Sequence, residues 1–592
     1  MRAMLENHSQ TAFERAVAAL NSEQFAEANR LFGLVLDAEP NHVEAHVNRG
    51  FVLNRLGETD AAVASYRKAV EARPREPKLH AILGAVLQSA GRLDEAEASY
   101  RQAIALKPTD SKTYFKLASL LQGQGRWIDV EACLRQAVAE NPQDAAAHVQ
   151  LSGLFQGQGR LAEAEAHCRV AMALRPDDAG AYSNLLFIHD LTATATAASV
   201  QAERKRWAER FAPSGIDDAT FVNTPDPARR LKIGYISADF RQTSAALVFG
   251  AMLTKFNPEQ FTVYAYSNSR LVDEVTRRFQ HSVNHWRNIQ DLSDENAARM
   301  IRDDGIDILV DLSGHSSGNR MQLFARKPAP IQVTAWGYLS GTGMPAMDVI
   351  FADPIIVPED ERAFYAEDVV YLPNGVSAAY FLTKYPEVND LPAATAGRVT
   401  FGSFNRLAKL SDEVLKLWAR VVSGVPGSEM IIKAPGLESP HLRARILKHF
   451  SDAGVDLARI AFMRRSSWSE QMTAFNKIDI SLDSFPHCGG VTTLEGLMMG
   501  VPVVTLSWPT IVGRLSASCM NTLGLNGWIA NTQDQYVAIA IEKAKDLVQL
   551  AELRKTLRAR LLNSVLGDAN AYAAAVEIEY RTLWKKWCES KK

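Results

Sequence analysis

The chain has 592 residues, several times the roughly 100–200 residues of a typical domain, so we expect about three packed units. Its 65 basic and 67 acidic side chains give a net charge of -2, which argues against general electrostatic binding of nucleic acid or of an anionic membrane. Charges interrupt the apolar stretches well before the ~18 residues that span a bilayer, and the first residues lack a secretory signal. We therefore expect a soluble, cytoplasmic protein with neither nucleic acid nor a membrane as partner.

The cysteine pattern does not suggest a metal centre. The five cysteines are odd in number, far apart and without a CxxC spacing: Cys133, Cys168, Cys488, Cys519 and Cys588. This pattern predicts neither a disulfide framework nor a zinc site. The chain also lacks an HExxH motif. We expect a protein that works without a metal ion.

The first third of the chain repeats with a period of 34 residues. Prolines recur at this step at Pro40, Pro74, Pro108, Pro142 and Pro176. Glycines recur in phase with them at Gly57, Gly91, Gly125 and Gly159. Further columns hold Ala69, Ala103, Ala137 and Ala171, and the small residues Gly50, Gly84, Ala118 and Ser152. Several columns with one shared period indicate a tandem repeat.

Each 34-residue unit reads as two short amphipathic helices. The glycine permits the tight turn between them, the proline ends the second helix, and the small residues let the pair approach closely. The period resembles that of the tetratricopeptide repeat and covers about residues 11–190.

Stacked repeats of this kind form a concave surface that binds other proteins. The inward column is polar in four of its five places: Asn48, Ile82, Lys116, Gln150 and Asn184. We expect this surface to hold proteins or peptides. The alternative is a spacer or a dimerising element, which leaves a homodimer open.

Beyond the repeats, residues 191–227 predict a helical linker that ends in the segment FVNTPDPARR. Short β-branched and aromatic runs then alternate with helix-length polar stretches, which predicts parallel β/α units. The first runs are RLKIGYISADF, FTVYAYSNS, GIDILVDLSG and APIQVTAWGY, and the later ones RVTFGSFN, SEMIIKAPG, RIAFMRR, IDISLDSF and VPVVTLSWP. We expect two Rossmann-like halves, residues 228–395 and 396–570, and a closing helix at 571–592.

In such folds ligands bind beyond the carboxyl ends of the strands. Residues 478–504 read as a strand, a glycine-containing loop, a helix and a second strand. The loop and the first helical turn comprise Gly489, Gly490, Val491, Thr492 and Thr493. The glycines let backbone N–H groups approach a ligand, the threonines can cap the helix, and the helix N-terminus favours diphosphate oxygens. Glu495, one turn further, is a candidate acceptor for ribose hydroxyls. An ordinary strand–helix connection, with glycine and threonine as turn and cap, remains the alternative.

Five motifs follow one another in this part of the chain: ADF, DLSGHSSGNRMQLFARKPAPIQV, WGYLSGTGMPAMD, FNRLAKLSDEVLKLWARVVSGVPGS and LDSFPHCGGVTTLEGLMMGVPVVTL. Together they resemble the O-linked N-acetylglucosamine transferase and SPINDLY family, in a member of bacterial type, over about residues 228–590. The resemblance implies an α/β GT-B fold after the helical repeats, and transfer of a sugar from a nucleotide diphosphate donor.

The same resemblance implies roles for residues near the donor. Lys409 would lie against the diphosphate, where a fixed cation stabilises the charge that develops on the leaving group. Asn405 and Arg406 would lie beside the donor phosphate, although the family more often has glutamine at the second place. Gln471 stands where relatives often have a histidine near the donor base or phosphate, and Val491 where they have one in the phosphate loop. Glutamine can form hydrogen bonds but carries no charge.

On the acceptor side the family runs a loop beside the sugar, which here is Ser340, Gly341, Thr342 and Gly343. A flexible turn is the alternative for this loop. Thr243 stands where the family has an active-site histidine, and a threonine cannot accept a proton near neutral pH. A general base must then come from Asp239 or from His315. For His487, in a place where relatives commonly have an aromatic residue, we expect stacking or packing.

The resemblance thus implies an inverting transferase that moves a sugar to Ser or Thr hydroxyls of proteins presented by the repeats. UDP-GlcNAc is the first candidate donor, and GDP-fucose remains open because no residue reads the base. One alternative is a repeat scaffold whose transferase part binds a nucleotide sugar with little turnover. Another is a transferase that acts on a non-protein acceptor.

Overall fold

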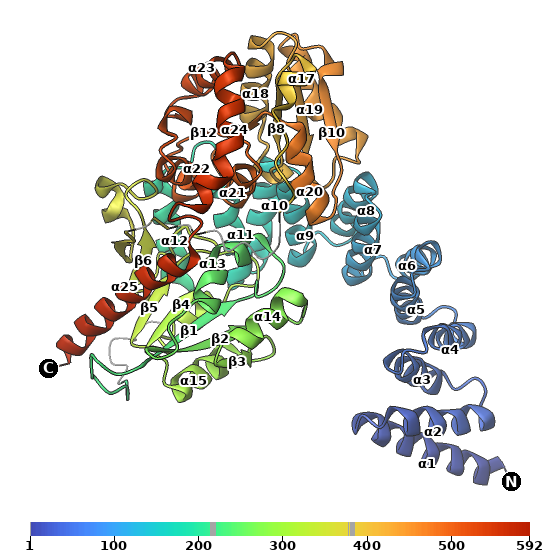
Figure 1. Ribbon diagram of the computed structural model, residues 1–592. Coiled ribbons are helices and arrows are strands. Elements are labelled where there is room, and N and C mark those ends of the chain that lie inside the picture. Colours follow the sequence, from blue (N-terminus) through green and yellow to red (C-terminus); the bar gives the residue numbers. More distant parts are fainter. Residues whose placement is uncertain (1, 213–220, 374, 377, 379–384, 592) are drawn as a thin grey trace. The chain divides into compact units, whose positions relative to one another are not determined.

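In Figure 1 the computed structural model describes residues 2–212, 221–373, 375, 376, 378 and 385–591. The chain forms two compact units, Met1–Leu154 and Phe155–Lys592. Their boundary falls inside α9 (Ala145–Gly157), before residue 190, where the repeats are predicted to end. The last helices of the repeat region therefore belong to the same unit as the β-sheets.

The first unit is built from helix pairs. Their bounds are α1 (Arg2–Asn21), α2 (Phe25–Ala38), α3 (Val43–Arg55), α4 (Thr59–Ala72), α5 (Pro77–Ser89), α6 (Leu93–Leu106), α7 (Ser111–Gly123) and α8 (Trp127–Glu140). The turns inside the pairs require glycine, because Gly57, Gly91 and Gly125 have φ angles of +83°, +74° and +74° in the left-handed region. The predicted glycine column thus marks the turns.

Close contact within each pair explains the column of small residues. A Cβ atom on Gly50 would come within 2.7 Å of the Tyr66 ring, and one on Gly84 equally close to the Tyr100 ring. Both tyrosines are buried between their helices. A larger residue in this column would therefore push the two helices of a repeat apart.

The second unit opens with three further helices of the repeat and linker region: α10 (Leu161–Leu174), α11 (Ala179–His189) and α12 (Ala197–Phe211). The predicted linker contains α12, which starts at a capping box in which Thr196 Oγ1 accepts from Ser199 N at 3.2 Å. Trp207 of α12 is buried in a cluster with Ile236 and Tyr264 of the first sheet. Helix α12 is thus a packed part of the unit.

The first sheet contains seven parallel strands among the described residues, in the order β3-β2-β1-β4-β5-β6-β7. The strands are β1 (Leu231–Ser237), β2 (Phe261–Ser267), β3 (His285–Asn288), β4 (Ile308–Asp311), β5 (Ile331–Thr334), β6 (Val349–Ala352) and β7 (Asp368–Tyr371). The helices of this half are α13 (Ser244–Thr254), α14 (Glu274–Ser282), α15 (Asp294–Asp304) and α16 (Met321–Phe324). The four strands predicted from hydrophobic runs are confirmed as β1, β2, β4 and β5.

The second sheet, as far as the chain is described, has six parallel strands in the order β10-β9-β8-β11-β12-β13. The strands are β8 (Thr400–Ser403), β9 (Glu429–Lys433), β10 (Ile460–Met463), β11 (Ile480–Leu482), β12 (Val503–Leu506) and β13 (Ile529–Ala530). The helices are α17 (Pro392–Ala396), α18 (Asp412–Gly424), α19 (Pro440–Asp452), α20 (Trp468–Ala474), α21 (Val491–Met498), α22 (Ile511–Thr522), α23 (Gln533–Lys543) and α24 (Leu547–Leu562).

Both sheets reverse their strand order at one place, between β1 and β4 in the first and between β8 and β11 in the second. Such a reversal leaves a crevice at the carboxyl ends of the two strands, where doubly wound folds bind ligands. The two series of predicted strands therefore form two Rossmann-like halves, and each half has one such point.

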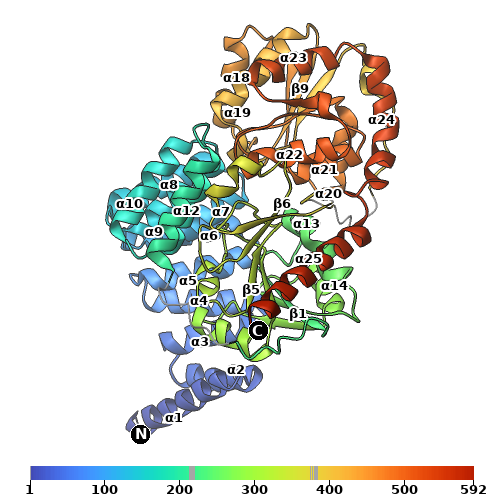
Figure 2. The same cartoon turned by 90° about the vertical axis from the view of Figure 1, so that its left-hand side faces the viewer.

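The last helix, α25 (Ala569–Ser590), returns from the second half to the first, as Figure 1 and Figure 2 both show. The predicted apolar stripe of this helix is buried in the core of the first sheet at Tyr572, Val576, Tyr580 and Leu583. The Tyr572 hydroxyl donates to Val376 O at 2.8 Å and accepts from Trp336 Nε1 at 2.7 Å. The helix thus ties the two halves into one unit.

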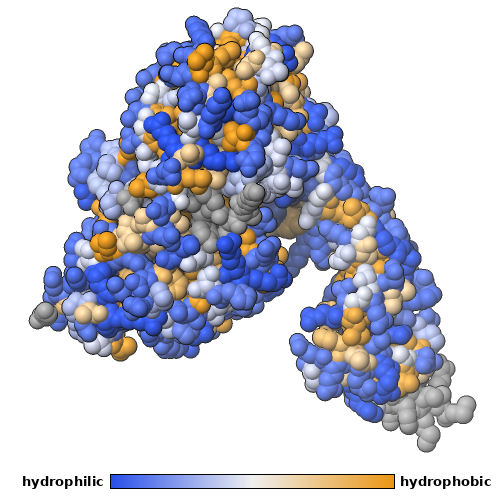
Figure 3. Space-filling view, in the orientation of Figure 1, coloured by the Kyte–Doolittle hydropathy of each residue, from blue (hydrophilic) through white to orange (hydrophobic). Residues whose placement is uncertain are grey.

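Hydrophilic side chains predominate on the face shown in Figure 3. None of the described helices combines the length and the apolar character that a membrane crossing requires. Within the described parts of the chain, no three His, Cys, Asp or Glu side chains gather in a way that suits a metal ion.

Candidate functional site

Two segments singled out from the sequence lie together at the carboxyl ends of β8 and β11, where the strand order of the second sheet reverses. The loop after β8 leads through Asn405 into the short 3-10 helix η2 (Leu407–Lys409), and the loop after β11 leads into α21. Lys409 Nζ donates a hydrogen bond to the backbone oxygen of Cys488. Thr492 Oγ1 donates to Asn405 Oδ1 at 2.9 Å. The predicted cation therefore lies against the predicted phosphate loop.

Lys409 is nearly buried, with 8% of its surface exposed. Burial lowers the pKa of its ammonium group to about 8, and the charge of Arg406 adds to this effect. Since the group is still mainly protonated at neutral pH, it offers a positive charge with little water around it. A charge in such surroundings acts on an anion more strongly than one in bulk solvent.

The glycines of the loop are required by its geometry. Gly490, the residue before α21, has a φ of +62° and a ψ of -101°, which only glycine adopts at low cost. A Cβ on Gly489 would come within 2.5 Å of Thr493 Oγ1 and 2.8 Å of Thr492 Oγ1. The first intrahelical bond of α21 runs from Leu494 N to Gly490 O, so the earlier N–H groups have no acceptor inside the helix.

One prediction for this loop is wrong: Thr492 and Thr493 do not cap α21. The cap position belongs to Gly490, which has no side chain, so the threonines lie inside the first turn. Their hydroxyls instead bind other segments, Thr492 to Asn405 and Thr493 to Ser516 Oγ at 2.7 Å. The threonines therefore fix the loop against its neighbours.

Glu495 and Gln471, both predicted to lie near the donor, are neighbours in the structure. The Glu495 carboxyl group is buried, which raises its pKa to about 7, while hydrogen bonds from Gln471 and Trp468 of α20 oppose this rise. At neutral pH the group is thus only partly ionised. It remains an acceptor for a hydroxyl in its ionised form.

Asp483 is a member of the site that the sequence-based prediction missed. It follows β11 directly, is buried, and accepts hydrogen bonds from Thr505 Oγ1 at 2.9 Å and from Ser484 N at 2.9 Å. Burial raises the pKa of its carboxyl group, and Lys409 is among the groups that oppose this rise. The signal that could have identified it is its position, since it is an acidic residue directly after a buried strand.

In the first half, Asp239 lies just beyond the carboxyl end of β1. Its side chain forms an ion pair with Arg241 at 3.5 Å, and burial raises the pKa of its carboxyl group. Thr243 caps α13, because its Oγ1 accepts from Ala246 N at 3.3 Å and donates to Asp239 O at 3.4 Å. The threonine in the place of the family histidine therefore has a structural role here.

The loop of Ser340, Gly341, Thr342 and Gly343 is not the flexible turn that was the alternative. Its four residues are buried. Ser340 O accepts from Gln201 Nε2 of α12 at 2.6 Å, and Thr342 donates to Glu367 Oε1 from both its backbone N and its hydroxyl at 2.6 Å. The loop is thus packed between α12 and the first sheet.

His315 does not suit the role of general base. Its ring is buried, with Nε2 3.0 Å from Thr342 O and Nδ1 3.4 Å from Ser183 Oγ, and it forms a T-shaped contact with the Trp207 ring at 4.8 Å. Burial, with a contribution from the Arg204 charge, lowers its pKa to about 3. An imidazole that weakly basic takes up little proton at neutral pH, and its hydrogen bonds instead join α11 to the 340–343 loop.

Three aromatic rings meet where the last repeat, the first half and the second half converge. Phe187 of α11 stacks on Tyr338 with ring centroids 5.0 Å apart. His487 lies 6.4 Å from Phe187 and 6.3 Å from Tyr338, so it packs among aromatic rings as expected. The Tyr338 hydroxyl also donates to Asp190, which pairs with Arg204 at 2.7 Å.

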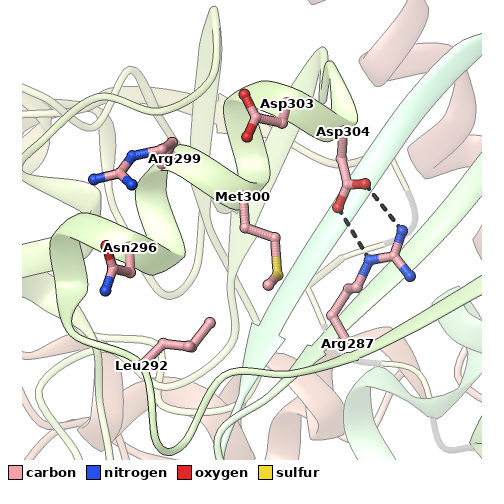
Figure 4. A pocket seen from close by; sticks show the side chains of 7 residues that line it. All are labelled: Arg287, Leu292, Asn296, Arg299, Met300, Asp303 and Asp304. Carbon is pink, nitrogen blue, oxygen red and sulfur yellow. Dashed lines mark hydrogen bonds and ion pairs between the residues drawn. The ribbon is translucent and has the colours of Figure 1, made fainter.

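A separate hollow of about 500 Å³ lies on the first half and is shown in Figure 4. It is lined by Arg287, Leu292, Asn296, Arg299, Met300, Asp303 and Asp304. Arg287 and Asp304 lie side by side in this view and are already paired at 3.1 Å. None of the residues predicted for the site lines this hollow.

Comparison with protein families assigns both parts of the chain. The model of glycosyl transferase family 41 matches residues 217–390 and 386–576. Models of the tetratricopeptide repeat match residues 13–77, 53–111 and 87–150.

Known proteins agree with this assignment. A probable UDP-N-acetylglucosamine–peptide N-acetylglucosaminyltransferase, SPINDLY of Arabidopsis thaliana, is 34% identical over 391 residues, which are 65% of this chain and 42% of the plant protein. The chain thus spans less than half the length of such plant relatives. The solved structure of a mutant Thermobaculum terrenum O-GlcNAc transferase is 30% identical, with a TM-score of 0.79, and the match covers 87% of this chain and 98% of that one. The order of repeats and paired parallel sheets is therefore that of a GT-B transferase, and the protein belongs to glycosyltransferase family 41.

Proposed function

We propose that the protein transfers a sugar, with inversion, from a nucleotide diphosphate donor to Ser or Thr hydroxyls of other proteins. The observation that carries this proposal is the contact between Lys409 and the loop that precedes α21. A buried cation and the N-terminal N–H groups of a helix, side by side at the strand reversal of the second sheet, suit a diphosphate.

The departing nucleoside diphosphate gains negative charge as the glycosidic bond breaks. Lys409 supplies a fixed positive charge for that step, and α21 adds the partial charge of its N-terminus. Since these groups belong to the protein, we expect transfer to proceed without an added divalent metal. Activity that survives exhaustive treatment with a chelator supports this expectation, and activity that returns only with a divalent ion contradicts it.

The acceptor hydroxyl must lose a proton during transfer, and this chain has Thr243 where the family has an active-site histidine. With Thr243 engaged in a cap and His315 buried with a low pKa, Asp239 is the remaining candidate that the sequence named. Its position at the strand reversal of the first sheet and its raised pKa both suit a general base. We expect Asp239→Asn to reduce kcat about 10²–10⁴-fold. The matched control Glu259→Gln, at an exposed carboxyl of the same half, should leave kcat unchanged.

The acceptor and the sugar are inferred from relatives. Tetratricopeptide repeats form surfaces that bind proteins, which favours protein acceptors. The names of the plant relatives make UDP-GlcNAc the first donor to test. GDP-fucose and a non-protein acceptor remain outcomes of the experiment.

The experiment has two stages. Calorimetry with UDP, UDP-GlcNAc, GDP and GDP-fucose identifies the donor, and a mass-shift assay on co-expressed proteins detects transfer. Lys409→Ala should remove transfer, while Lys416→Ala, an exposed lysine on α18, should not. A donor that binds without any sugar transfer, and equally well to Lys409→Ala, would overturn the proposal and favour a nucleotide-sugar-binding scaffold.

A further inference from the structure

Helix α22 belongs to the second half by sequence, but its two faces contact different parts of the unit. One face carries Ile511, Arg514, Leu515 and Ser518, which are spaced by three or four residues and so lie on one side of the helix. This side meets the first half. The other side, with Val512 and Ser516, meets the loop that precedes α21.

Contact with the first half centres on a charged pair. Arg514 binds Glu361 of the 3-10 helix η1 (Glu359–Phe364) with two hydrogen bonds of 2.7 Å, and its Nη1 also donates to Ile356 O at 3.3 Å. Only 10% and 15% of the two charged side chains are exposed. One turn along, Ser518 Oγ donates to Asp353 Oδ2 at 2.7 Å. A two-bond guanidinium–carboxylate pair fixes direction as well as distance.

Ile511 strengthens this contact without charge. It is buried in an apolar cluster with Ile356, Val357 and Tyr365 of the first half, and Leu515 packs at the edge of that cluster. The side of α22 that carries Ile511 and Arg514 thus packs against the first half rather than against the sheet of its own half.

On its other side, α22 holds the phosphate loop at several points. The Val512 backbone oxygen accepts from Cys488 N at 3.0 Å, and Ser516 N donates to Cys488 Sγ at 3.2 Å. Ser516 Oγ lies 2.7 Å from Thr493 Oγ1 and accepts from Gly490 N at 3.4 Å. The loop therefore takes its position from α22 as well as from Lys409.

We propose that the contact between α22 and the first half controls the geometry of the donor loop, residues 489–493. In this proposal Glu361 and Arg514 are positioning residues. Glu361 acts at a distance, because it binds α22 while the loop binds the opposite side of the same helix. A helix transmits such a displacement as a rigid element. This inference rests on the proposed function, in which residues 489–493 bind the donor diphosphate.

The test compares Glu361→Gln with the matched control Glu359→Gln. Glu359 lies on the same 3-10 helix and forms an exposed pair with Arg362 at 2.9 Å. The readouts are calorimetric Kd values for UDP and GDP, hydrogen exchange of residues 484–493, and melting temperature. We expect Glu361→Gln to raise the Kd of the nucleotide that binds by roughly 3- to 30-fold and to speed exchange in the loop. Glu359→Gln should change neither.

Two further variants separate positioning from general stability. The charge swap Glu361→Arg with Arg514→Glu should restore both Kd and exchange toward the wild type. In Ser516→Ala, where the link to the loop is already weakened, Glu361→Gln should have a smaller effect on Kd than in the wild type. If Glu361→Gln fails to fold, Ser518→Ala provides a milder change on the same side of α22.

The outcomes distinguish this inference from the proposed function. If wild-type protein binds neither UDP nor GDP, the proposed donor site is wrong, and hydrogen exchange of the unliganded loop still decides the coupling. If a nucleotide binds but Glu361→Gln matches Glu359→Gln in Kd and in exchange, the coupling through α22 is wrong.

Discussion

Lys409 Nζ donates a hydrogen bond to the backbone oxygen of Cys488, so the cation after β8 is held by the loop after β11. The bond connects residues 79 positions apart in the sequence. It keeps the ammonium group buried, and burial is the main cause of its pKa of about 8. The charge at the candidate donor site therefore titrates close to the physiological range.

This pKa predicts how donor use depends on pH. Lys409 is protonated below pH 8 and loses its charge above it, so kcat/KM for the donor should fall as the pH rises through about 8. Lys409→Arg keeps a charge throughout this range, because the guanidinium pKa lies far higher. Profiles of kcat/KM between pH 6 and 10 provide the measurement. A wild-type profile that stays flat to pH 10 contradicts the assignment of Lys409.

A second prediction concerns Gly490, whose backbone conformation no other residue adopts without strain. In Gly490→Ala the new Cβ would have space, since its nearest neighbour is Leu515 Cδ1 at 3.8 Å. The cost is therefore conformational, about 1–3 kcal/mol of unfolding free energy, and it falls on the donor loop. We expect Gly490→Ala to lower both the unfolding free energy and nucleotide affinity.

Gly454→Ala is the matched control, with a φ of +71° and nothing within 4 Å of a new Cβ. It should cost about 1 kcal/mol of unfolding free energy and leave the nucleotide Kd unchanged. Equal effects of the two substitutions on Kd would show that the loop conformation is not needed for binding.

A third prediction concerns the buried pair Asp190–Arg204. Arg204 Nη2 lies 2.7 Å from Asp190 Oδ2, and both side chains are almost fully buried. Arg204→Met leaves the Asp190 carboxylate without its cation, so we expect a loss of about 3–5 kcal/mol of unfolding free energy. Arg206→Met breaks the ion pair with Glu203. Because the Arg206 side chain is 67% exposed, this change should cost under about 1 kcal/mol of unfolding free energy. Denaturant titrations followed by tryptophan fluorescence measure both, and similar losses would contradict this account.

Local periodicity explains why most of the architecture could be predicted from the sequence. The 34-residue columns and the apolar runs of the central strands are signals within a short stretch of chain. The structure adds β3, β6, β7 and β13, which are short strands at the edges of the two sheets or, for β6, next to an edge. The cap at α21 was predicted wrongly because a glycine occupies that position, and its conformation is not visible in the sequence.

Long-range contacts explain the remaining differences. His315 is unsuited to proton transfer because its ring is buried against Ser183, 132 positions earlier in the chain, and against Trp207 of α12. The 340–343 loop is buried by Gln201 of the same helix. The burial of His315 and the burial of the 340–343 loop both depend on the packing of α11 and α12 against the first half. Sequence motifs within the transferase part carry no information about that packing.

This docking leads to a fourth prediction, about where the chain can be shortened. The second compact unit begins at Phe155, and α11 supplies Ser183, Phe187 and Asp190 to contacts with the transferase halves. A variant that lacks residues 2–144 keeps α9 and all these contacts. We expect it to fold and to bind nucleotide with the Kd of the full chain, while protein acceptors are used poorly because most of the repeat surface is gone.

A variant that lacks residues 2–190 provides the comparison. It exposes Tyr338 and His487, and it removes Ser183 from His315 and Asp190 from Arg204, so it should fold poorly or bind nucleotide weakly. Calorimetry with the nucleotide and a transfer assay on a protein acceptor distinguish the two variants. Equal nucleotide affinity in both would show that α11 only tethers the repeats. Full use of protein acceptors by the shorter truncation, the one lacking residues 2–144, would instead show that the first unit does not present the acceptor, and would favour a site for the acceptor within the second unit itself.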